Sequence, residues 1–361
     1  MHPYTACTLS QRQDRLRRAN GFDGLRLLLA VGIVVFHSFT ITSSTSALPP
    51  FLGAIAWLIL PSFFALSGYL VTSSASRCKS VGEFLLLRGL RILPALAFVV
   101  IATALVFGPL LSSMSPSDYF TNPLVPNYLK NILAAPQFHL PGVFENNPRA
   151  GVVNGSLWTI SLEMTCYALL AFVVFLSRGR IMTIAILCLA AILLFPRLPF
   201  VGLAFTWMPA KELTLAFFAG ALVNRFVHVI PFHPMLGLAC IIAALALALH
   251  QSSLVAFPLA YAVVFIGLHP IPAWLTSADY SYGIYLLSYP LQQMNLHLSP
   301  VAATWWGNLL LSAPLVILGA TSIWHCIERP VLSRKRQVLD FCCNREVSAR
   351  LMIRTMPSSS C

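Results

Sequence analysis

The chain has 361 residues, of which 58% are hydrophobic and only 9% are charged. A soluble domain carries about a quarter charged residues, so this composition excludes a soluble globular protein and favours an integral membrane protein. The formal net charge of +12 is expected to mark the cytoplasmic side of such a protein rather than to bind nucleic acid.

Ten apolar segments are long enough to be predicted as membrane-spanning helices, so the predicted fold class is all-α and polytopic. In chain order they cover residues 24–42, 51–73, 94–114, 157–177, 181–196, 212–227, 233–250, 252–268, 280–299 and 303–326. The main predicted loop is 115–156. The predicted organisation is a basic amino-terminal segment at 1–22, a membrane domain at 23–330 and a basic tail at 331–361.

Ten spans place both termini on one side of the membrane, and most of the 23 Lys and Arg residues fall on that side. Only four fall on the other side: Lys130, Arg149, Arg197 and Lys211. This asymmetry predicts an inner-membrane protein with both termini in the cytoplasm. A cleaved signal peptide within 1–47 is the alternative, but cleavage would leave nine spans and upset the charge balance.

The nine cysteines include no CxxC pair and the chain has no HExxH motif, so no metal site is predicted. None of them falls in a segment expected outside the cell, so no structural disulfide is expected. Cys342 and Cys343 are interpreted as plain cysteines of the tail, with palmitoylation or metal binding as the alternatives.

The first predicted span carries Arg26 and His37. A charged residue inside a bilayer helix costs about 2.5–3.5 kcal/mol on insertion scales, so such residues need a reason. The two residues lie on one helical face, about 16 Å apart along the axis. His37 is either a hydrogen-bonding residue in helix packing or a general base, because imidazole titrates near neutral pH.

A polar stripe follows one face of the fourth predicted span, at Ser156, Thr159, Glu163 and Tyr167. The stripe either bonds neighbouring helices or serves chemistry. Burying a carboxylate without a partner costs free energy. Counting the helix rise from the membrane surface places Glu163 and His37 at similar depths. We therefore expect Glu163 and His37 to pair.

A second polar layer is expected at the cytoplasmic face, made of Asp23, Arg26, Arg88, Arg91 and Glu328. If their segment is helical, Arg88 and Arg91 share a face and form a double guanidinium clamp suited to phosphate. The alternative is that they only anchor the topology.

Six short motifs occur in one order between residues 21 and 330. They are Asp23-Gly24-Leu25-Arg26 with His37, Phe63–Tyr69, Arg88–Pro94, Ser156–Glu163, Tyr280–Leu286 and Glu328-Arg329-Pro330. With these motifs the chain resembles the membrane acyltransferase-3 family. Members of that family move acyl groups from acyl-coenzyme A to sugars of envelope glycans, lipo-oligosaccharides or secreted metabolites.

The resemblance implies roles for individual residues. Catalytic roles fall on Arg26, His37 and Glu163, and the coenzyme A moiety would be bound by Arg88 and Arg91. Structural or accessory roles fall on a larger group: Asp23, Ser156, Trp158, Tyr167, Tyr285 and Glu328. The chain departs from the family where Ser288 replaces the histidine of a His-x-Pro motif and where Cys166 replaces a phenylalanine.

The resemblance implies a membrane-embedded O-acyltransferase that uses cytoplasmic acyl-coenzyme A, with acetyl as the expected acyl group. The acceptor would be a sugar hydroxyl of an envelope or exported glycan or glycolipid. Apart from the lipid bilayer, these two substrates are the expected partners; no permanently bound cofactor and no nucleic acid are expected. Direct transfer with His37 as base and an acylated His37 intermediate both stay open, as do the acceptor's identity and the oligomeric state.

Two other classes of function remain as alternatives. A secondary transporter also uses membrane-buried Arg, His and Glu, but it predicts matching interrupted helices in two repeated halves, and the chain has no matching pair. A structural membrane partner would use its polar residues only to join helices, and single substitutions would then have mild effects.

Overall fold

The computed structural model describes residues 7–16, 21–176, 210–272 and 278–339, and within these ranges the chain forms helices and no strand. The expected all-helical fold is therefore confirmed for the described residues. The α-helices are α1 (Leu9–Leu16), α2 (Phe22–Ile41), α3 (Pro50–Ala75), α4 (Val81–Ala102), α5 (Gly108–Leu111), α6 (Pro116–Thr121), α7 (Leu124–Leu129), α8 (Leu157–Leu176), α11 (Ala210–Arg225), α12 (Pro234–Leu249), α13 (Ala256–Gly267), α14 (Ser281–Leu298), α15 (Trp305–Ile323) and α16 (Arg329–Ser333).

Five helical segments are long and apolar enough to cross a membrane. They are Phe22–Ile41, Pro50–Ala75, Val81–Leu111, Leu157–Phe175 and Trp305–Ser333. Shorter apolar helices occupy Pro234–Leu249 and Ser253–Gly267. The predicted spans at 212–227 and 280–299 correspond to α11 and α14, which are not among the five, and the predicted span at 181–196 lies outside the described residues. The count of about ten spans is therefore not confirmed.

The helix that carries the third predicted span begins at Val81, well before the predicted start at residue 94. Its start is fixed by capping: the Ser80 hydroxyl accepts a hydrogen bond from the Glu83 amide, and the Glu83 carboxylate accepts one from the Lys79 amide. Two π-helical turns, Thr103–Phe107 and Trp324–Glu328, join α4 to α5 and α15 to α16. Arg88 and Arg91 consequently sit on a continuous helix.

A close helix crossing joins α3 to α11. A Cβ atom added at Gly68 would lie 1.8 Å from the Phe217 carbonyl oxygen, and one added at Gly220 would lie 2.0 Å from the Ala65 carbonyl oxygen. Only glycine fits at such a backbone approach, which is a common way for membrane helices to pack. This crossing fixes the position of α3, whose opposite face carries part of the site described below.

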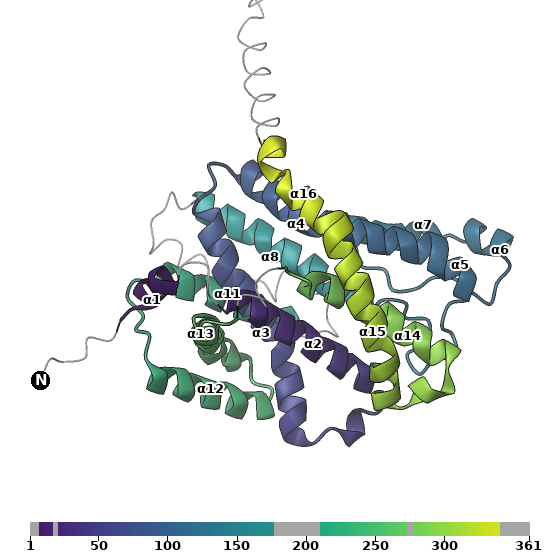
Figure 1. The fold of residues 1–361 in the computed structure, drawn as a ribbon, viewed down its shortest axis with the longest axis horizontal. Coiled ribbons are helices and arrows are strands. Elements are labelled where there is room, and N and C mark those ends of the chain that lie inside the picture. Colours follow the sequence, from purple (N-terminus) through teal and green to yellow (C-terminus); the bar gives the residue numbers. More distant parts are fainter. Residues whose placement is uncertain (1–6, 17–20, 177–209, 273–277, 340–361) are drawn as a thin grey trace, which may run out of the picture.

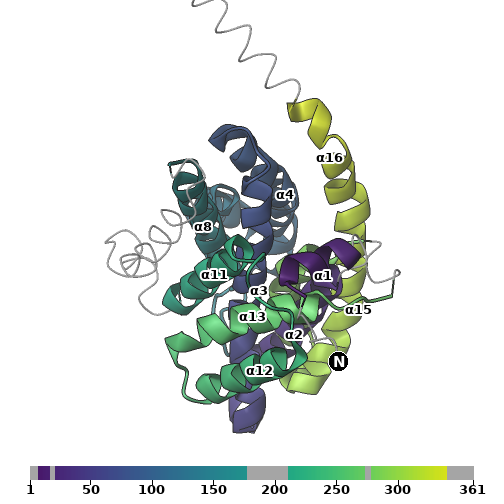
Figure 2. The same cartoon turned by 90° about the vertical axis from the view of Figure 1, so that its left-hand side faces the viewer.

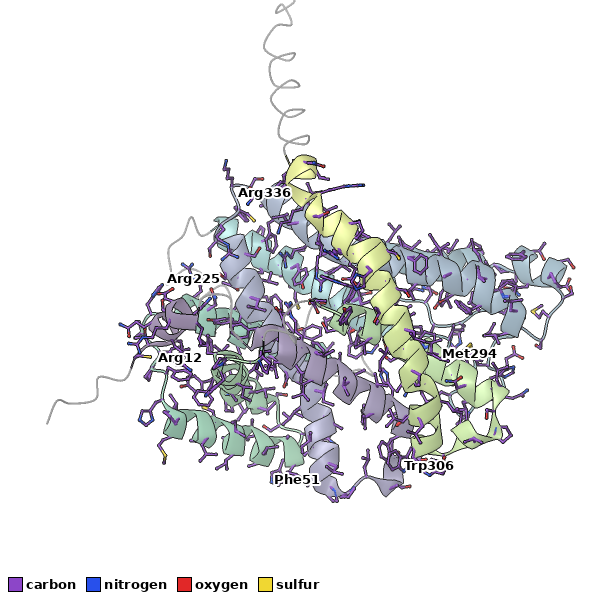
Figure 3. All side chains as sticks on the ribbon, viewed as in Figure 1. Arg12, Phe51, Arg225, Met294, Trp306 and Arg336 are labelled. Atoms are coloured by element: carbon purple, nitrogen blue, oxygen red, sulfur yellow. The ribbon has the colours of Figure 1, made fainter. Side chains whose placement is uncertain are left out.

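The helices surround α3. It packs against α2, α8, α11, α12 and α13, while α14 packs between α2 and α15. Figure 1 shows α15 and α16 as one long helix running diagonally across the molecule, and Figure 2 shows it on the side opposite α8. In Figure 3, Arg336 is labelled beside the upper end of this helix, and Trp306 and Phe51 are labelled at the lower end of the molecule.

Candidate active site

A cavity of about 640 Å³ is lined by residues of α2, α3, α4, α8 and α14 and of the segment that follows α16. Along α3 its lining runs from Leu60 to Ser74, and Arg77 continues it just past the end of that helix. Seventeen residues separate Leu60 from Arg77, which corresponds to about 25 Å of helix. This length is close to the thickness of about 30 Å of a bilayer's hydrocarbon core.

Arg91 is held by two carboxylates. One terminal nitrogen, Nη1, donates to Oε2 of Glu328, which is buried in the π-helical turn before α16. The other, Nη2, donates to Oδ2 of Asp279, which lies just before α14. Because these partners belong to different elements, Arg91 ties α4 to the starts of α14 and α16.

Arg26 joins the same cluster. Its Nη1 lies 3.5 Å from Asp279 Oδ2 and 3.8 Å from Asp23 Oδ1. Asp279 also accepts a 2.5 Å hydrogen bond from the Ser281 hydroxyl on its other oxygen. Burial alone would raise the pKa of Asp279, but Arg91 and Arg26 hold that pKa below its usual value. Asp279 is therefore the shared carboxylate between two arginines.

Arg88 has a different environment from Arg91, although both line the cavity as their spacing predicts. Its Nη2 donates a 3.3 Å hydrogen bond to the Ser74 hydroxyl. Within the described residues, no carboxylate lies at ion-pair distance from Arg88, and its buried Nε has no hydrogen-bond partner. The two arginines of the expected double guanidinium clamp therefore differ in their surroundings: carboxylates neutralise Arg91, whereas none in the described part of the chain pairs with Arg88.

Glu163 faces the cavity as part of a hydroxyl cluster. Its Oε1 accepts a 2.8 Å hydrogen bond from Ser67 on α3 and a 2.5 Å hydrogen bond from Tyr167, one turn along α8. The Ser67 and Tyr167 oxygens are themselves 3.1 Å apart. All three residues line the cavity, so the carboxylate is both fixed in place and accessible.

The rest of the polar stripe on α8 meets α14. Thr159 and Tyr285 share a hydrogen bond between their hydroxyls, and both line the cavity. Tyr285 also donates to the Ser156 carbonyl oxygen at 3.1 Å. Ser156 and Trp158 are buried and do not line the cavity. The hydrogen bonds of Tyr285 to Thr159 and to the Ser156 carbonyl thus join α8 to α14 beside the cavity.

His37 lies outside the cavity lining. Its ring packs edge-on against Tyr289, with 5.1 Å between ring centroids, and its buried Nδ1 has no hydrogen-bond partner in the described part of the chain. Tyr289, the residue that His37 packs against, lies one helical turn, about 6 Å of helix rise, from the cavity-lining Tyr285. His37 is therefore placed next to the inner part of the cavity rather than within it.

The expected pairing of His37 with Glu163 is not observed, because Glu163 bonds to Ser67 and Tyr167 and no ion pair joins it to His37. Counting the helix rise per residue gave the depth of each residue in the membrane but not the direction in which its side chain points. Glu163 points toward α3, whereas His37 points toward α14.

The sequence reasoning also missed two residues of the site, Asp279 and Ser67. Asp279 immediately precedes the Tyr280–Leu286 motif, and Ser67 lies within the Phe63–Tyr69 motif. Both positions were therefore next to or within recognised motifs. The sequence pattern did not reveal their roles, because the residue to which each of them bonds lies more than 90 positions away in the sequence.

Comparison with known proteins identifies the family of the chain. The family model of the acyltransferase-3 type, described as an acyltransferase domain, matches residues 19–325. An O-acetyl transferase of Shigella phage Sf6 is 27% identical over 344 residues, covering 88% of this chain and 98% of the relative. No solved structure matches the chain. The chain thus belongs to the acyltransferase-3 family and is an O-acyltransferase.

Proposed function

We propose that this protein is an inner-membrane O-acetyltransferase that takes an acetyl group from cytoplasmic acetyl-coenzyme A and transfers it to a sugar hydroxyl of a glycan or glycolipid. The observation that carries the proposal is the cavity itself. Basic residues gather at the end where Arg77 and Arg336 lie, and a fixed carboxylate, Glu163, lies further in. This order suits a donor with an anionic head and a long neutral arm.

The charges of the described residues support the orientation. Arg77, Lys335 and Arg336 line the same end of the cavity, which we assign to the cytoplasm because basic residues concentrate on that side of membrane proteins. Both termini would then be cytoplasmic. Reporter fusions after Pro330 should read cytoplasmic, and fusions within 115–150 should read extracytoplasmic; a cytoplasmic 115–150 loop would overturn this orientation.

In the proposed reaction, the acceptor oxygen attacks the thioester carbonyl carbon and its proton passes to a base. The carbon–sulfur bond breaks, and the coenzyme A thiolate leaves and takes up a proton. We assign the base to His37, since it lies beyond the donor cavity, where an acceptor arriving from the opposite side would meet it. We favour direct transfer over an acylated His37, because His37 does not line the cavity that would hold the thioester.

The decisive experiment uses the purified full-length chain in lipid nanodiscs with radiolabelled acetyl-coenzyme A and membrane glycolipids as acceptor. We expect acetylated acceptor to form, and we expect coenzyme A to be released only when acceptor is present. Release of one equivalent per enzyme without acceptor would instead indicate an acylated enzyme. If no acetyl transfer occurs with any envelope glycan fraction, the proposed acceptor class is wrong.

Thiol labelling tests donor occupancy of the cavity independently of turnover. Cys78 lines the cavity, whereas Cys326 is exposed and does not. Coenzyme A should protect Cys78 from maleimide and leave Cys326 labelling unchanged. Burial raises the pKa of the Cys78 thiol, so labelling should be slow at neutral pH and accelerate in mildly alkaline buffer as the thiolate forms. Equal labelling of Cys78 with and without coenzyme A would count against a donor in this cavity.

A further inference from the structure

The end of α16 and the segment that follows it form part of the cavity wall. Leu332, Lys335, Arg336 and Leu339 all line the cavity. Residues 335–339 are helical, and the spacing of these four positions places them along one helical face. The match to the family model ends at residue 325, so this wall is contributed by a part of the chain outside the family domain.

Two further cations line the same end of the cavity, one just past the end of α3 and one on α4. Arg77 follows the end of α3, and Arg88 lies two turns into α4. Figure 2 shows the start of α4 and the end of α16 on different sides of the upper part of the molecule. The lining therefore brings basic residues together from both sides of the cavity.

These four cations are not neutralised by the protein. Within the described residues, every ion pair involves Arg26 or Arg91, and none involves Arg77, Arg88 or the Lys335–Arg336 pair. Glu83 is the nearby carboxylate of this lining, and one of its oxygens is used by the Lys79 amide. The end of the cavity consequently keeps a positive charge that suits an anion with several phosphate groups.

We propose that segment 332–339 is part of the donor site and that Lys335 and Arg336, together with Arg77 and Arg88, bind the phosphate groups of the acyl donor. The assignment rests on the proposed function and changes the role of the tail from a topological anchor to a wall of the site. Arg91 is excluded from this role, because its guanidinium is already bound to Asp279 and Glu328.

Phosphate could also come from anionic lipid headgroups. The donor is favoured because Lys335 and Arg336 line a cavity that also contains Glu163, whereas their neighbour Arg334, which is exposed as they are, does not line it. Arg334 thus provides a matched control on the same segment: it carries a positive charge and is exposed without lining the cavity.

The test compares the Lys335→Ala, Arg336→Ala double variant with Arg334→Ala, both as full-length chains in neutral-lipid nanodiscs. We expect the double variant to raise KM for acetyl-coenzyme A about tenfold with kcat within about twofold, since each lost charged contact weakens ground-state and transition-state binding alike. Arg334→Ala should keep the wild-type KM. With acetyl-3′-dephospho-coenzyme A as donor, the difference between the double variant and the wild type should shrink.

Three results would overturn the inference. The first is an equal KM in the double variant and Arg334→Ala, which would make the tail irrelevant to the donor. The second is a loss of kcat with unchanged KM, which would indicate a structural role. The third is an effect that appears only when phosphatidylglycerol is added to the nanodiscs, which would assign the cations to lipid. A wild-type protein that does not use acetyl-coenzyme A at all would instead refute the proposed function.

Discussion

Asp279→Asn isolates the shared carboxylate of the arginine cluster, because it removes the charge and keeps the size of the side chain. The variant leaves Arg91 with Glu328 alone and leaves Arg26 with the more distant Asp23. We expect a lower free energy of unfolding and a loss of transfer activity, since α4 and the start of α14 would no longer be tied together.

The magnitude follows from the two contacts. A hydrogen bond to a charged group contributes about 1.5–3 kcal/mol, and Arg91 makes the close one. Arg26 lies at 3.5 Å, the limit of hydrogen bonding, and contributes less than about 1 kcal/mol. The total loss should be about 2–4 kcal/mol. Since the pKa of Asp279 is lowered by these arginines, the loss should persist from neutral pH down to about pH 5. It should shrink only below about pH 4, as the carboxyl group protonates.

Denaturant unfolding in mixed micelles measures this loss, with Glu145→Gln as the control because Glu145 is exposed. The control should change the free energy of unfolding by less than about 0.5 kcal/mol. A double-mutant cycle between Asp279→Asn and Arg91→Gln should give a coupling of about 1.5–3 kcal/mol, larger than the coupling to Arg26→Gln. A coupling to Arg91 below about 0.5 kcal/mol would refute the role assigned to Asp279.

Three further substitutions test the site and the fold. Glu163→Gln keeps an oxygen that can accept from Ser67 but removes the charge, so transfer should fall at least about 100-fold if the carboxylate takes part in proton transfer, and an unchanged rate would leave it a helix-joining group. His37→Gln should fold normally and abolish transfer, because an amide cannot accept a proton at neutral pH; substantial remaining transfer would make His37 a packing residue. Gly68→Ala should sharply reduce folded protein, since its Cβ would meet backbone at 1.8 Å, whereas Gly53→Ala, with open space around it, should express normally; equal yields would contradict the close crossing.

The sequence predicted the helices better than their bounds or their number. Apolar length is a strong signal for a membrane helix, and five segments meet it. The span that α4 carries was predicted to start too late, because the charged residues Glu83, Arg88 and Arg91 interrupt the apolar pattern of a helix whose beginning depends on local capping by Ser80 and Glu83. Hydropathy reports burial in lipid and carries no information about such hydrogen bonds.

The candidate site was predicted in composition but not in pairing. Helical spacing correctly placed Arg88 and Arg91 on one face and brought Glu163 together with Tyr167. It could not indicate that the Arg91 side chain meets Glu328, 237 positions away, or that Ser67 meets Glu163. Periodicity orders side chains on one helix, whereas these contacts depend on how neighbouring helices are rotated.

The pairing has a consequence for how a charged donor could enter a membrane protein. Around Arg26 and Arg91, three carboxylates offset the guanidinium charges: Asp23, Asp279 and Glu328. Among the described residues that line the cavity, the cations without an ion-pair partner lie toward the end that Arg77 and Arg336 line. If the donor is an acyl-coenzyme A, as proposed, its phosphates would be attracted there and not further in, because the paired arginines offer little net charge. The neutral arm of that donor would then extend past the paired layer toward Glu163, with the thioester near the hydroxyl cluster of Glu163, Ser67 and Tyr167.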